Sequence, residues 1–266
     1  MTNLIDAMHQ CAKQQNKDVG EIFEAVVQAA YEAIIEPGNH IIDLGAHYGD
    51  HLFPMARCTG PSGKVFAFEP IPYLYRYLKR SARQQGLRNI KFFKRAAGLN
   101  RGKSSFQHFK RYPAYSGLQR RETPFSDEQG ELETIHVKQV QLDSVFNRFA
   151  RFRGHTHIDF IKLDIEGGEL HALMGGRALL ARSRPVMVFE GGSQSSAQTY
   201  HYRKDDFFGF FESLNFHIFS LDGAAFTRET WERPPPCWEF YAIPTERLSM
   251  VERLPAFAKM VLDRYS

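Results

Sequence analysis

A glycine-containing loop at the end of one predicted strand is the first feature that indicates chemistry. The strand expected over His40–Leu44 runs into this loop, and a helix follows it. Glycines let a backbone turn tightly and approach a ligand closely, and the free N–H groups at a helix start attract polar ligands. Neither the Gly-x-Gly-x-x-Gly pattern of NAD-binding folds nor the complete pattern of a phosphate loop occurs in the chain. The loop is therefore predicted to bind a nucleotide-like cofactor through Asp43, Gly45, Ala46, His47 and Gly49.

An acid, Glu69, ends the next predicted strand, and Pro70 stops that strand. An acid at this place can accept hydrogen bonds from both ribose hydroxyls of an adenosyl group. The alternative interpretation is a plain strand-to-helix turn with a solvated carboxylate. The order and spacing of the loop and the acid favour an adenosyl cofactor, and Ala96, at the end of the third strand, is expected beside the adenine.

A charged stretch forms the second informative pattern, because Lys162, Asp164 and Glu166 alternate along one predicted strand. Residues at a spacing of two share one face of a strand. Burying unpaired charges in a helix-covered sheet is costly, so we expect these charges to pair at the open carboxyl end, where such sheets bind ligands. Asp164 is expected to hold the cofactor's amine or to take a proton from the acceptor, and Glu166 is the alternative. A structural ion pair with Lys162 is the competing explanation.

The elements that must position these residues alternate between apolar strands and helices, which is typical of a mainly parallel sheet covered on both faces. A helix is predicted over Glu21–Ile35, within a helical segment 1–38. Two further strands, Lys103–Phe109 and Thr134–Leu142, are predicted in an insertion at about 98–142. Seven sheet strands are expected, with the last two antiparallel at one edge: His40–Leu44, Val65–Glu69, Ile90–Arg95, Ile158–Asp164, Val186–Glu190, His217–Leu221 and Trp238–Ile243. Asp143 is expected to cap a helix that begins at Ser144.

The composition allows one main domain, with 266 residues of which 43% are hydrophobic. No uninterrupted apolar stretch approaches the roughly 18 residues of a membrane span, and the first residues lack the pattern of a signal peptide, so a cytoplasmic location is expected. The three cysteines are too few and too widely spaced to indicate a disulfide framework or a zinc site.

Basic residues are concentrated in one segment. Fourteen of the 34 Lys and Arg residues lie between Ile71 and Arg121, where no Asp or Glu occurs. Such an asymmetry usually concerns a partner rather than the fold. Because the insertion should emerge beside the cofactor, Arg111, Tyr115 and Ser116 are predicted to border an anionic acceptor, and Glu190 is expected to orient it. The alternatives are a solvated outer helix or binding of RNA by the basic segment.

Metal binding and hydrolysis are not expected. Asp164 and Glu190 could ligate a metal, but the sequence indicates no third ligand, and His155-Thr156-His157 is more typical of a solvated loop. The Gly-x-Ser-x-Gly motif of serine hydrolases is absent.

The stretches IIDLGAHYGDH, VFAFEPIPYLYRYL, AAGLNRGKSSF, VQLDSVF, IDFIKLDIEGGELHALMGG and VMVFEGG together resemble the FkbM family of methyltransferases, from about Ile41 to Gly192. The Lys-x-Asp-x-Glu-Gly-x-Glu segment is the most diagnostic part. The resemblance implies a class I, Rossmann-like methyltransferase domain over 39–266, with S-adenosylmethionine as methyl donor and a hydroxyl of a sugar, glycan or natural product as acceptor.

Site residues follow from this resemblance by position. Asp43, Gly45, Gly49 and Glu69 match the family's cofactor motif, and Asp164 and Glu166 match its charged strand. His47 stands where the family usually has Asn, and it is expected either to contact the cofactor or to act near the methyl group. An RNA methyltransferase and a binding module without activity remain the competing functions, and the oligomeric state is left open.

Overall fold

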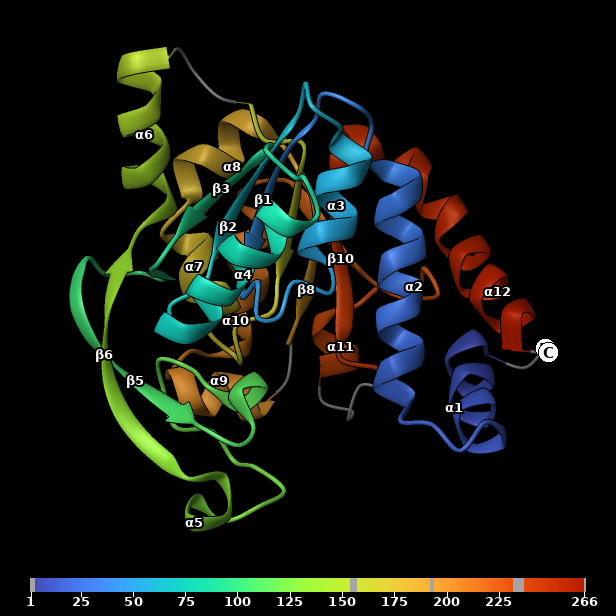
Figure 1. Cartoon of the computed structure of the whole chain (residues 1–266). Coiled ribbons are helices and arrows are strands. Elements are labelled where there is room, and N and C mark those ends of the chain that lie inside the picture. The colour runs from blue at the N-terminus through green and yellow to red at the C-terminus, as the bar shows by residue number, and fades with distance from the viewer. Residues whose placement is uncertain (1–2, 154–156, 192–193, 232–236, 266) are drawn as a thin grey trace.

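The computed structural model describes residues 3–153, 157–191, 194–231 and 237–265. His155, Thr156 and the three prolines at 234–236 lie outside the described residues. A central seven-stranded sheet has the order β3-β2-β1-β7-β8-β10-β9 (Figure 1). Its strands are β1 (His40–Leu44), β2 (Lys64–Phe68), β3 (Ile90–Phe93), β7 (Phe160–Leu163), β8 (Val186–Glu190), β9 (Phe216–Ser220) and β10 (Glu239–Pro244). The predicted α/β fold with seven sheet strands is therefore confirmed.

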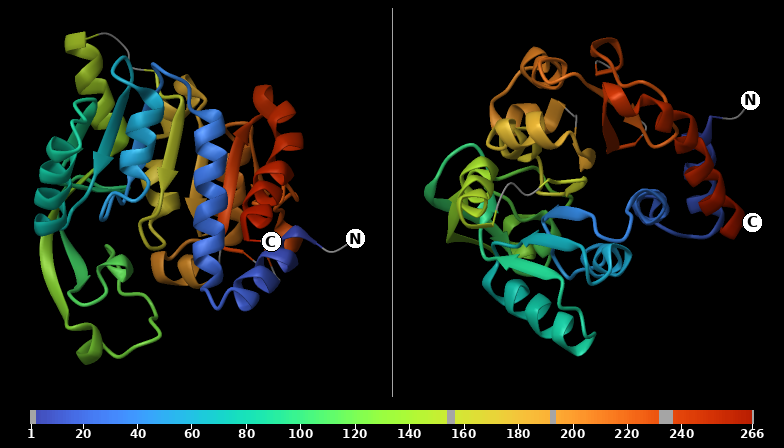
Figure 2. Two further views of the ribbon diagram at one scale, coloured as in Figure 1. Left: turned by 45° about the vertical axis from the view of Figure 1, so that its right-hand side comes forward. Right: turned by 90° about the horizontal axis from the view of Figure 1, so that it is seen from above.

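Helices cover both faces of this sheet, and each face has its own apolar core (Figure 2). One core packs against α1, α2, α3 and α12, and the other against α6, α7, α8 and α10. The helices are α1 (Leu4–Gln14), α2 (Val19–Ile34), α3 (Leu52–Thr59), α4 (Pro72–Gln84), α5 (Asp127–Gly130), α6 (Leu142–Arg153), α7 (Glu169–Met174), α8 (Arg177–Ser183), α9 (Gln194–Tyr200), α10 (Lys204–Glu212), α11 (Arg228–Trp231) and α12 (Leu254–Tyr265), with 3-10 turns η1 (Pro113–Tyr115) and η2 (Thr245–Arg253).

The helix predicted over Glu21–Ile35 is α2. It begins after Asp18, whose side chain accepts a hydrogen bond from the N–H of Gly20, and its apolar stripe is buried on the sheet. α1, which falls within the predicted helical segment 1–38, and α12, which was not expected from the sequence, pack beside α2 on this face. None of the helices in the described part of the chain combines the length and the apolar character needed to cross a membrane.

Strand order reverses at β1, which pairs in parallel with β2 on one side and β7 on the other. In open α/β sheets the carboxyl ends of the strands at such a reversal leave a crevice that binds ligands. The register places Asp43 of β1 directly beside Lys162 of β7. Two strongly charged side chains thus lie next to each other in the middle of the sheet.

The insertion forms β-structure, as predicted, and it projects from the main body (Figure 1). Two strands were expected there, but a third, short strand joins them in a separate three-stranded sheet. Its strands are β4 (Ala96–Ala97), β5 (Gly102–Phe109) and β6 (Leu132–Val140). The third strand of the main sheet ends at Phe93, because the chain passes from there into this second sheet. β6 ends at Val140, since α6 begins at Leu142.

The capping role expected for Asp143 is wrong. Asp143 lies inside the first turn of α6, and its carboxylate accepts hydrogen bonds from the N–H groups of Ala178 and Leu179 at 3.0 and 2.7 Å. It therefore caps the start of α8, a helix 35 residues further along the chain.

The last two strands of the main sheet are antiparallel, as expected. β10 pairs antiparallel with both β8 and β9 and lies between them, so β9 becomes the edge strand. This placement brings Glu239, at the start of β10, beside Glu190, at the end of β8. Two acids from distant parts of the sequence thereby meet at the same end of the sheet as the glycine loop after β1.

Candidate functional site

The glycine loop after β1 is held by its neighbours on both sides. The N–H groups of Gly45 and Ala46 both donate to the carbonyl of Phe68 at 3.1 Å. Gly45 has φ +86°, and a Cβ there would lie 1.8 Å from the carbonyl oxygen of Asp164. Only glycine fits this position, because the loop passes so close to the end of β7. The contact fixes the distance between the loop and Asp164.

Glu69 lies in the wall of the cavity beside this loop. Its two carboxylate oxygens accept hydrogen bonds from the backbone N–H groups of His47 at 3.0 Å and Ile71 at 2.7 Å. The side chain is 4% exposed. Burial raises the pKa of Glu69 to about 8, against the opposing effect of the two hydrogen bonds. A buried carboxyl group of this kind retains lone pairs that can accept further hydrogen bonds from hydroxyls.

His47 points its ring into the same cavity. Its backbone has φ +44°, in the left-handed region, and its Nε2 atom is buried with no hydrogen-bond partner among the described residues. Burial lowers the pKa of His47, although Asp164 acts in the opposite direction. The imidazole is therefore a neutral group with one polar atom left for a ligand.

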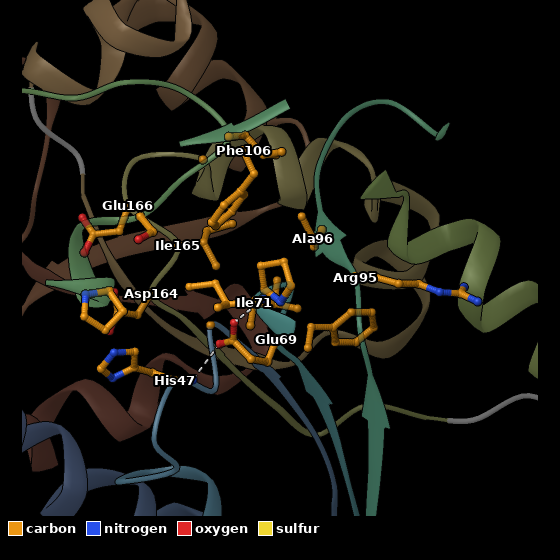
Figure 3. A pocket seen from close by; sticks show the side chains of 18 of the residues that line it. His47, Glu69, Ile71, Arg95, Ala96, Phe106, Asp164, Ile165 and Glu166 are labelled. Carbon is orange, nitrogen blue, oxygen red and sulfur yellow. Dashed lines mark hydrogen bonds between the residues drawn. The ribbon is translucent and has the colours of Figure 1, made fainter. Parts of the chain in front are cut away.

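The first cavity has a volume of about 100 Å³ and opens at the carboxyl ends of β1, β2 and β7. Figure 3 shows Glu69 near its centre, with Asp164, Glu166 and His47 on one side, Ala96 on the other and Phe106 above. Ligand pockets in proteins usually measure roughly 300–1,000 Å³. Residues of the insertion fill part of the space: Phe106, Pro113, Ala114, Ser116 and Leu118.

Four acids surround the buried side chain of Lys162. Its Nζ lies 3.3 Å from Oδ2 of Asp164. Burial alone would lower the pKa of Lys162, but the charges of Asp164, Glu24, Glu239 and Asp43 outweigh it and raise that pKa. Lys162 is therefore charged. The ion pair named as the competing explanation for this strand is present.

The charge of Lys162 has different net effects on the pKa values of Asp164 and Asp43. Burial opposes ionisation of Asp164, but the charge of Lys162 lowers its pKa overall. For Asp43 burial dominates and raises the pKa to about 6. Asp43 does not line the cavity. The Asp43 carboxyl group instead lies beside Lys162 on the neighbouring strand.

A second cavity, of about 600 Å³, adjoins the first and shares Ala114, Asp164 and Glu166 with it. Four acids from three segments line it: Glu24 of α2, Asp164 and Glu166 of the loop after β7, and Glu190 of β8. Burial and the neighbouring charge of Asp164 raise the pKa of Glu190 well above its ordinary value. Tyr115 and Trp238 supply aromatic surface, and Trp238 is 37% exposed.

Among the described residues that line the second cavity, Arg121 is the only basic one, and it forms an ion pair with Glu166. Arg121 belongs to the insertion, so this pair ties the insertion to the loop after β7. The expected acceptor contact Arg111 lies elsewhere. Its side chain is 64% exposed and pairs with Glu131 at 2.7 Å. Arg111 is thus not brought to either cavity, whereas Tyr115 and Ser116 are.

The sequence indicated no third metal ligand beside Asp164 and Glu190, but the structure places a third acid, Glu166, with them. Glu166 offers a carboxylate oxygen, and the three ligand atoms lie within 4.8 Å of one another. Glu166 takes the left-handed backbone conformation, with φ +64°, which turns its side chain toward this group. Two of the three acids already face a cation, Lys162 or Arg121.

Two residues of the second cavity were missed by sequence reasoning. Glu24 comes from α2, where it contacts His51, and Trp238 stands just before β10. Glu24 lies between the buried positions Phe23 and Val26 of an otherwise apolar stripe, and that interruption was the available signal. Trp238 carried no such signal, because its place depends on the order of β8, β10 and β9.

Comparison with known proteins matches most of the chain to one family. The family model described as "Methyltransferase FkbM domain" matches residues 43–218. A curated relative, "Methyltransferase sdnD" of Sordaria araneosa, is 27% identical over 172 residues, which are 57% of this chain and 66% of the relative. The match thus spans just under two thirds of that relative's length.

Two solved structures are also similar. The methyltransferase FkbM from Methylobacillus flagellatus KT is 20% identical with a TM-score of 0.47, over 90% of this chain and 58% of that chain. The fibrillarin of Aeropyrum pernix, solved with natively bound S-adenosyl-L-methionine, is 14% identical with a TM-score of 0.44, over 83% of this chain and 76% of that chain.

Proposed function

Since this chain belongs to the FkbM family of methyltransferases, we propose that it transfers a methyl group from S-adenosylmethionine to a hydroxyl oxygen of a sugar, glycan or natural product. The observation that carries the proposal is the meeting of two cavities at Asp164 and Glu166. A transfer reaction needs two ligands to touch at one point, and this site has one such point. The first cavity is assigned to the cofactor and the second to the acceptor.

The residues of the first cavity fit the cofactor. Glu69 offers buried carboxylate oxygens for ribose hydroxyls, Ala96 lies where the adenine is expected, and His47 has an unpartnered Nε2 among the described residues. When bound, S-adenosylmethionine supplies a methyl group that is already activated by a positively charged sulfur. The protein then contributes mainly alignment of the two ligands. The ionised carboxylate of Asp164 attracts the positive end of the cofactor.

Proton removal is assigned to Asp164. Of the two acids that border both cavities, Glu166 is engaged by Arg121, which leaves Asp164 as the carboxylate that faces both ligands. A hydroxyl oxygen that gains a methyl group becomes strongly acidic, so a carboxylate with a low pKa suffices to accept its proton. Lys162 keeps Asp164 ionised and ready for this role. His47 and Glu166 are assigned to binding.

The acceptor is proposed to be neutral or cationic. The acidic lining of the second cavity would repel the anionic acceptor that the basic segment suggested. The same argument weighs against RNA as the methylated molecule, since its phosphates would lie beside the ionised carboxylates of Glu24 and Asp164. Trp238 and Tyr115 offer flat apolar surface against which a sugar ring can pack.

The proposal is tested first by calorimetry with S-adenosylmethionine. The unchanged chain is expected to bind, and Glu69→Ala is expected to lose binding by about 100-fold or more, because two hydroxyl contacts to a buried carboxylate disappear. Glu252→Ala, at an exposed carboxylate on η2, serves as the matched control and should bind normally. Absence of binding by the unchanged chain would overturn the proposal.

The acceptor is then sought with isotopically labelled cofactor and mass spectrometry of product mixtures. Neutral glycosides, amino sugars and uronic-acid glycosides of matched size are offered together. Label is expected in the first two classes, with Asp164→Asn folded but at least about 100-fold slower. Label confined to the uronic-acid class would contradict the charge argument, and label on nitrogen or carbon would contradict O-methylation.

A further inference from the structure

A third cavity lies at the open edge of the main sheet, and the proposed methyl transfer does not use it. This basic groove, of about 920 Å³, runs between β3, the base of the β5–β6 hairpin and α6. Five of its lining residues are basic: Lys91, Arg95, Arg101, Lys138 and Arg148. Its lining contains no Asp or Glu among the described residues.

The structure divides the basic segment 71–121 into two parts. Towards its end, four cations are neutralised within the protein. Lys110 pairs with Glu133 at 2.9 Å, and Arg111 pairs with Glu131. Arg120 pairs with Asp127, and Arg121 pairs with Glu166. These residues account for part of the charge asymmetry without any partner.

The five cations of the basic groove behave differently. None of them forms an ion pair with a residue in the described ranges, although acids are available on the neighbouring hairpin. Two of them, Lys138 and Arg148, come from outside the basic segment and are brought to it by folding. Like charges that converge without counter-charges repel one another, so the arrangement costs stability in the free protein. Folding does not require these five cations to converge, so their arrangement points to an anionic ligand.

The shape of the cluster favours a compact ligand over a long chain. Its cations come from four separate segments and surround one groove, instead of following a line along the surface. A single-stranded nucleic acid is usually bound by aromatic rings with free faces. Here the ring of Phe93 stacks on Phe68, with centroids 4.5 Å apart, and Phe92 makes an edge contact with Tyr75. Phosphate groups, which need only cations, are the better match.

We propose that the basic groove binds a compact anion with two or more closely spaced phosphate groups. The phosphates could belong to a free nucleotide diphosphate or to a phosphorylated lipid headgroup, which share this chemistry. The site is separate from the reacting groups, because only Arg95 lines both the groove and the cofactor cavity. In Figure 3 the Arg95 side chain points away from Glu69 and Asp164.

Titration calorimetry of the full chain with pyrophosphate and with ADP, at about 0.15 M salt, tests this proposal. The double variant Lys138→Gln/Arg148→Gln is expected to weaken pyrophosphate binding by about tenfold or more. The control variant Arg76→Gln/Lys79→Gln removes the same charge from the exposed face of α4, outside the groove, and should change binding less than about twofold. Binding of S-adenosylmethionine to each variant reports that the fold is intact.

Two further arms separate the sources of the phosphates. ADP that binds at least as well as pyrophosphate indicates a nucleotide, and preferential binding to vesicles that carry a bisphosphorylated headgroup indicates a lipid. Equal weakening by both double variants would overturn the proposal in favour of diffuse surface charge. It is also overturned if neither pyrophosphate nor ADP binds below about 1 mM. The proposal of a compact ligand is also overturned if a single-stranded RNA binds far more tightly than pyrophosphate and ADP, and if both double variants weaken that binding to the same extent.

Discussion

The carboxyl group of Glu69 is buried in the free protein, and this fixes how stability should respond to pH. The folded chain raises its pKa from 4.5 to about 8, so the protonated form is favoured by folding. Stability from this group is fully present below about pH 4.5 and is lost as the pH rises toward 8. Burial shifts the pKa of Asp43 and Glu169 in the same direction, to about 6 and about 7.

The free energy of unfolding of the cofactor-free protein is therefore expected to fall between about pH 4.5 and pH 8. One such group contributes at most about 1.4 kcal/mol per pH unit. Glu69→Gln cannot titrate and should show a smaller slope than the unchanged chain, in urea unfolding followed at several pH values. Identical slopes for the two proteins would show that Glu69 is ionised in the folded state.

His47 is predicted to tolerate the residue that its family usually has there. Its backbone lies in the left-handed region, which Asn adopts readily and β-branched residues do not. His47→Asn should keep turnover within about threefold, whereas His47→Val should lose about tenfold or more in cofactor affinity. Steady-state kinetics and calorimetry measure both. A collapse of kcat in His47→Asn, with a changed pH profile, would assign the proton transfer to the imidazole instead of Asp164.

At the scale of the elements, the loop after β1 depends on one close contact. Gly45→Ala would drive a Cβ to 1.8 Å from the Asp164 carbonyl, whereas Gly86→Ala, at a similar positive φ, meets no atom within 4 Å. Gly86→Ala should cost only the backbone strain of about 1–2 kcal/mol. Gly45→Ala should cost several kcal/mol more or displace β1 from β7. Comparable midpoints in urea would contradict this close packing.

The strands were largely predictable from sequence because their apolar runs are short and bounded by glycines, prolines and charges. β1 and β8 have the predicted limits. The second sheet shifted the end of β3, since Ala96 and Ala97 pair with β6 across more than 40 residues of sequence. Charge pairing within the insertion was hidden for the same reason. The register of the hairpin decides which cations lie beside an acid. A count of basic residues in the sequence does not predict that register.

The residues of the first cavity were easier to predict from the sequence than those of the second cavity. Gly45, His47, Glu69 and Asp164 follow consecutive parallel strands, whose carboxyl ends must meet at one edge. Glu24 reaches the second cavity from a covering helix, and Trp238 reaches it from the segment just before the antiparallel strand β10. Their positions follow from packing of the whole chain, so local sequence could not reveal the acidic character of this cavity.

At the scale of the whole molecule, α1, α2 and α12 pack side by side over one face of the sheet (Figures 1 and 2). Phe257 of α12 is buried in this core, and Met260 of the same helix is 46% exposed. Phe257→Ala should lower the free energy of unfolding by roughly 3–5 kcal/mol and Met260→Ala by less than about 1 kcal/mol. Chemical denaturation measures both, and equal effects would show that α12 is not part of the cooperative unit.

Arg95 belongs to the walls of two cavities, one proposed for the cofactor and one for a phosphorylated ligand. Two ligands that share a side chain are thermodynamically linked. If occupation of the groove changes the dissociation constant of the cofactor by some factor, the cofactor must change the dissociation constant of the groove ligand by the same factor. A phosphorylated ligand at the edge of the sheet would then adjust how much cofactor the protein holds.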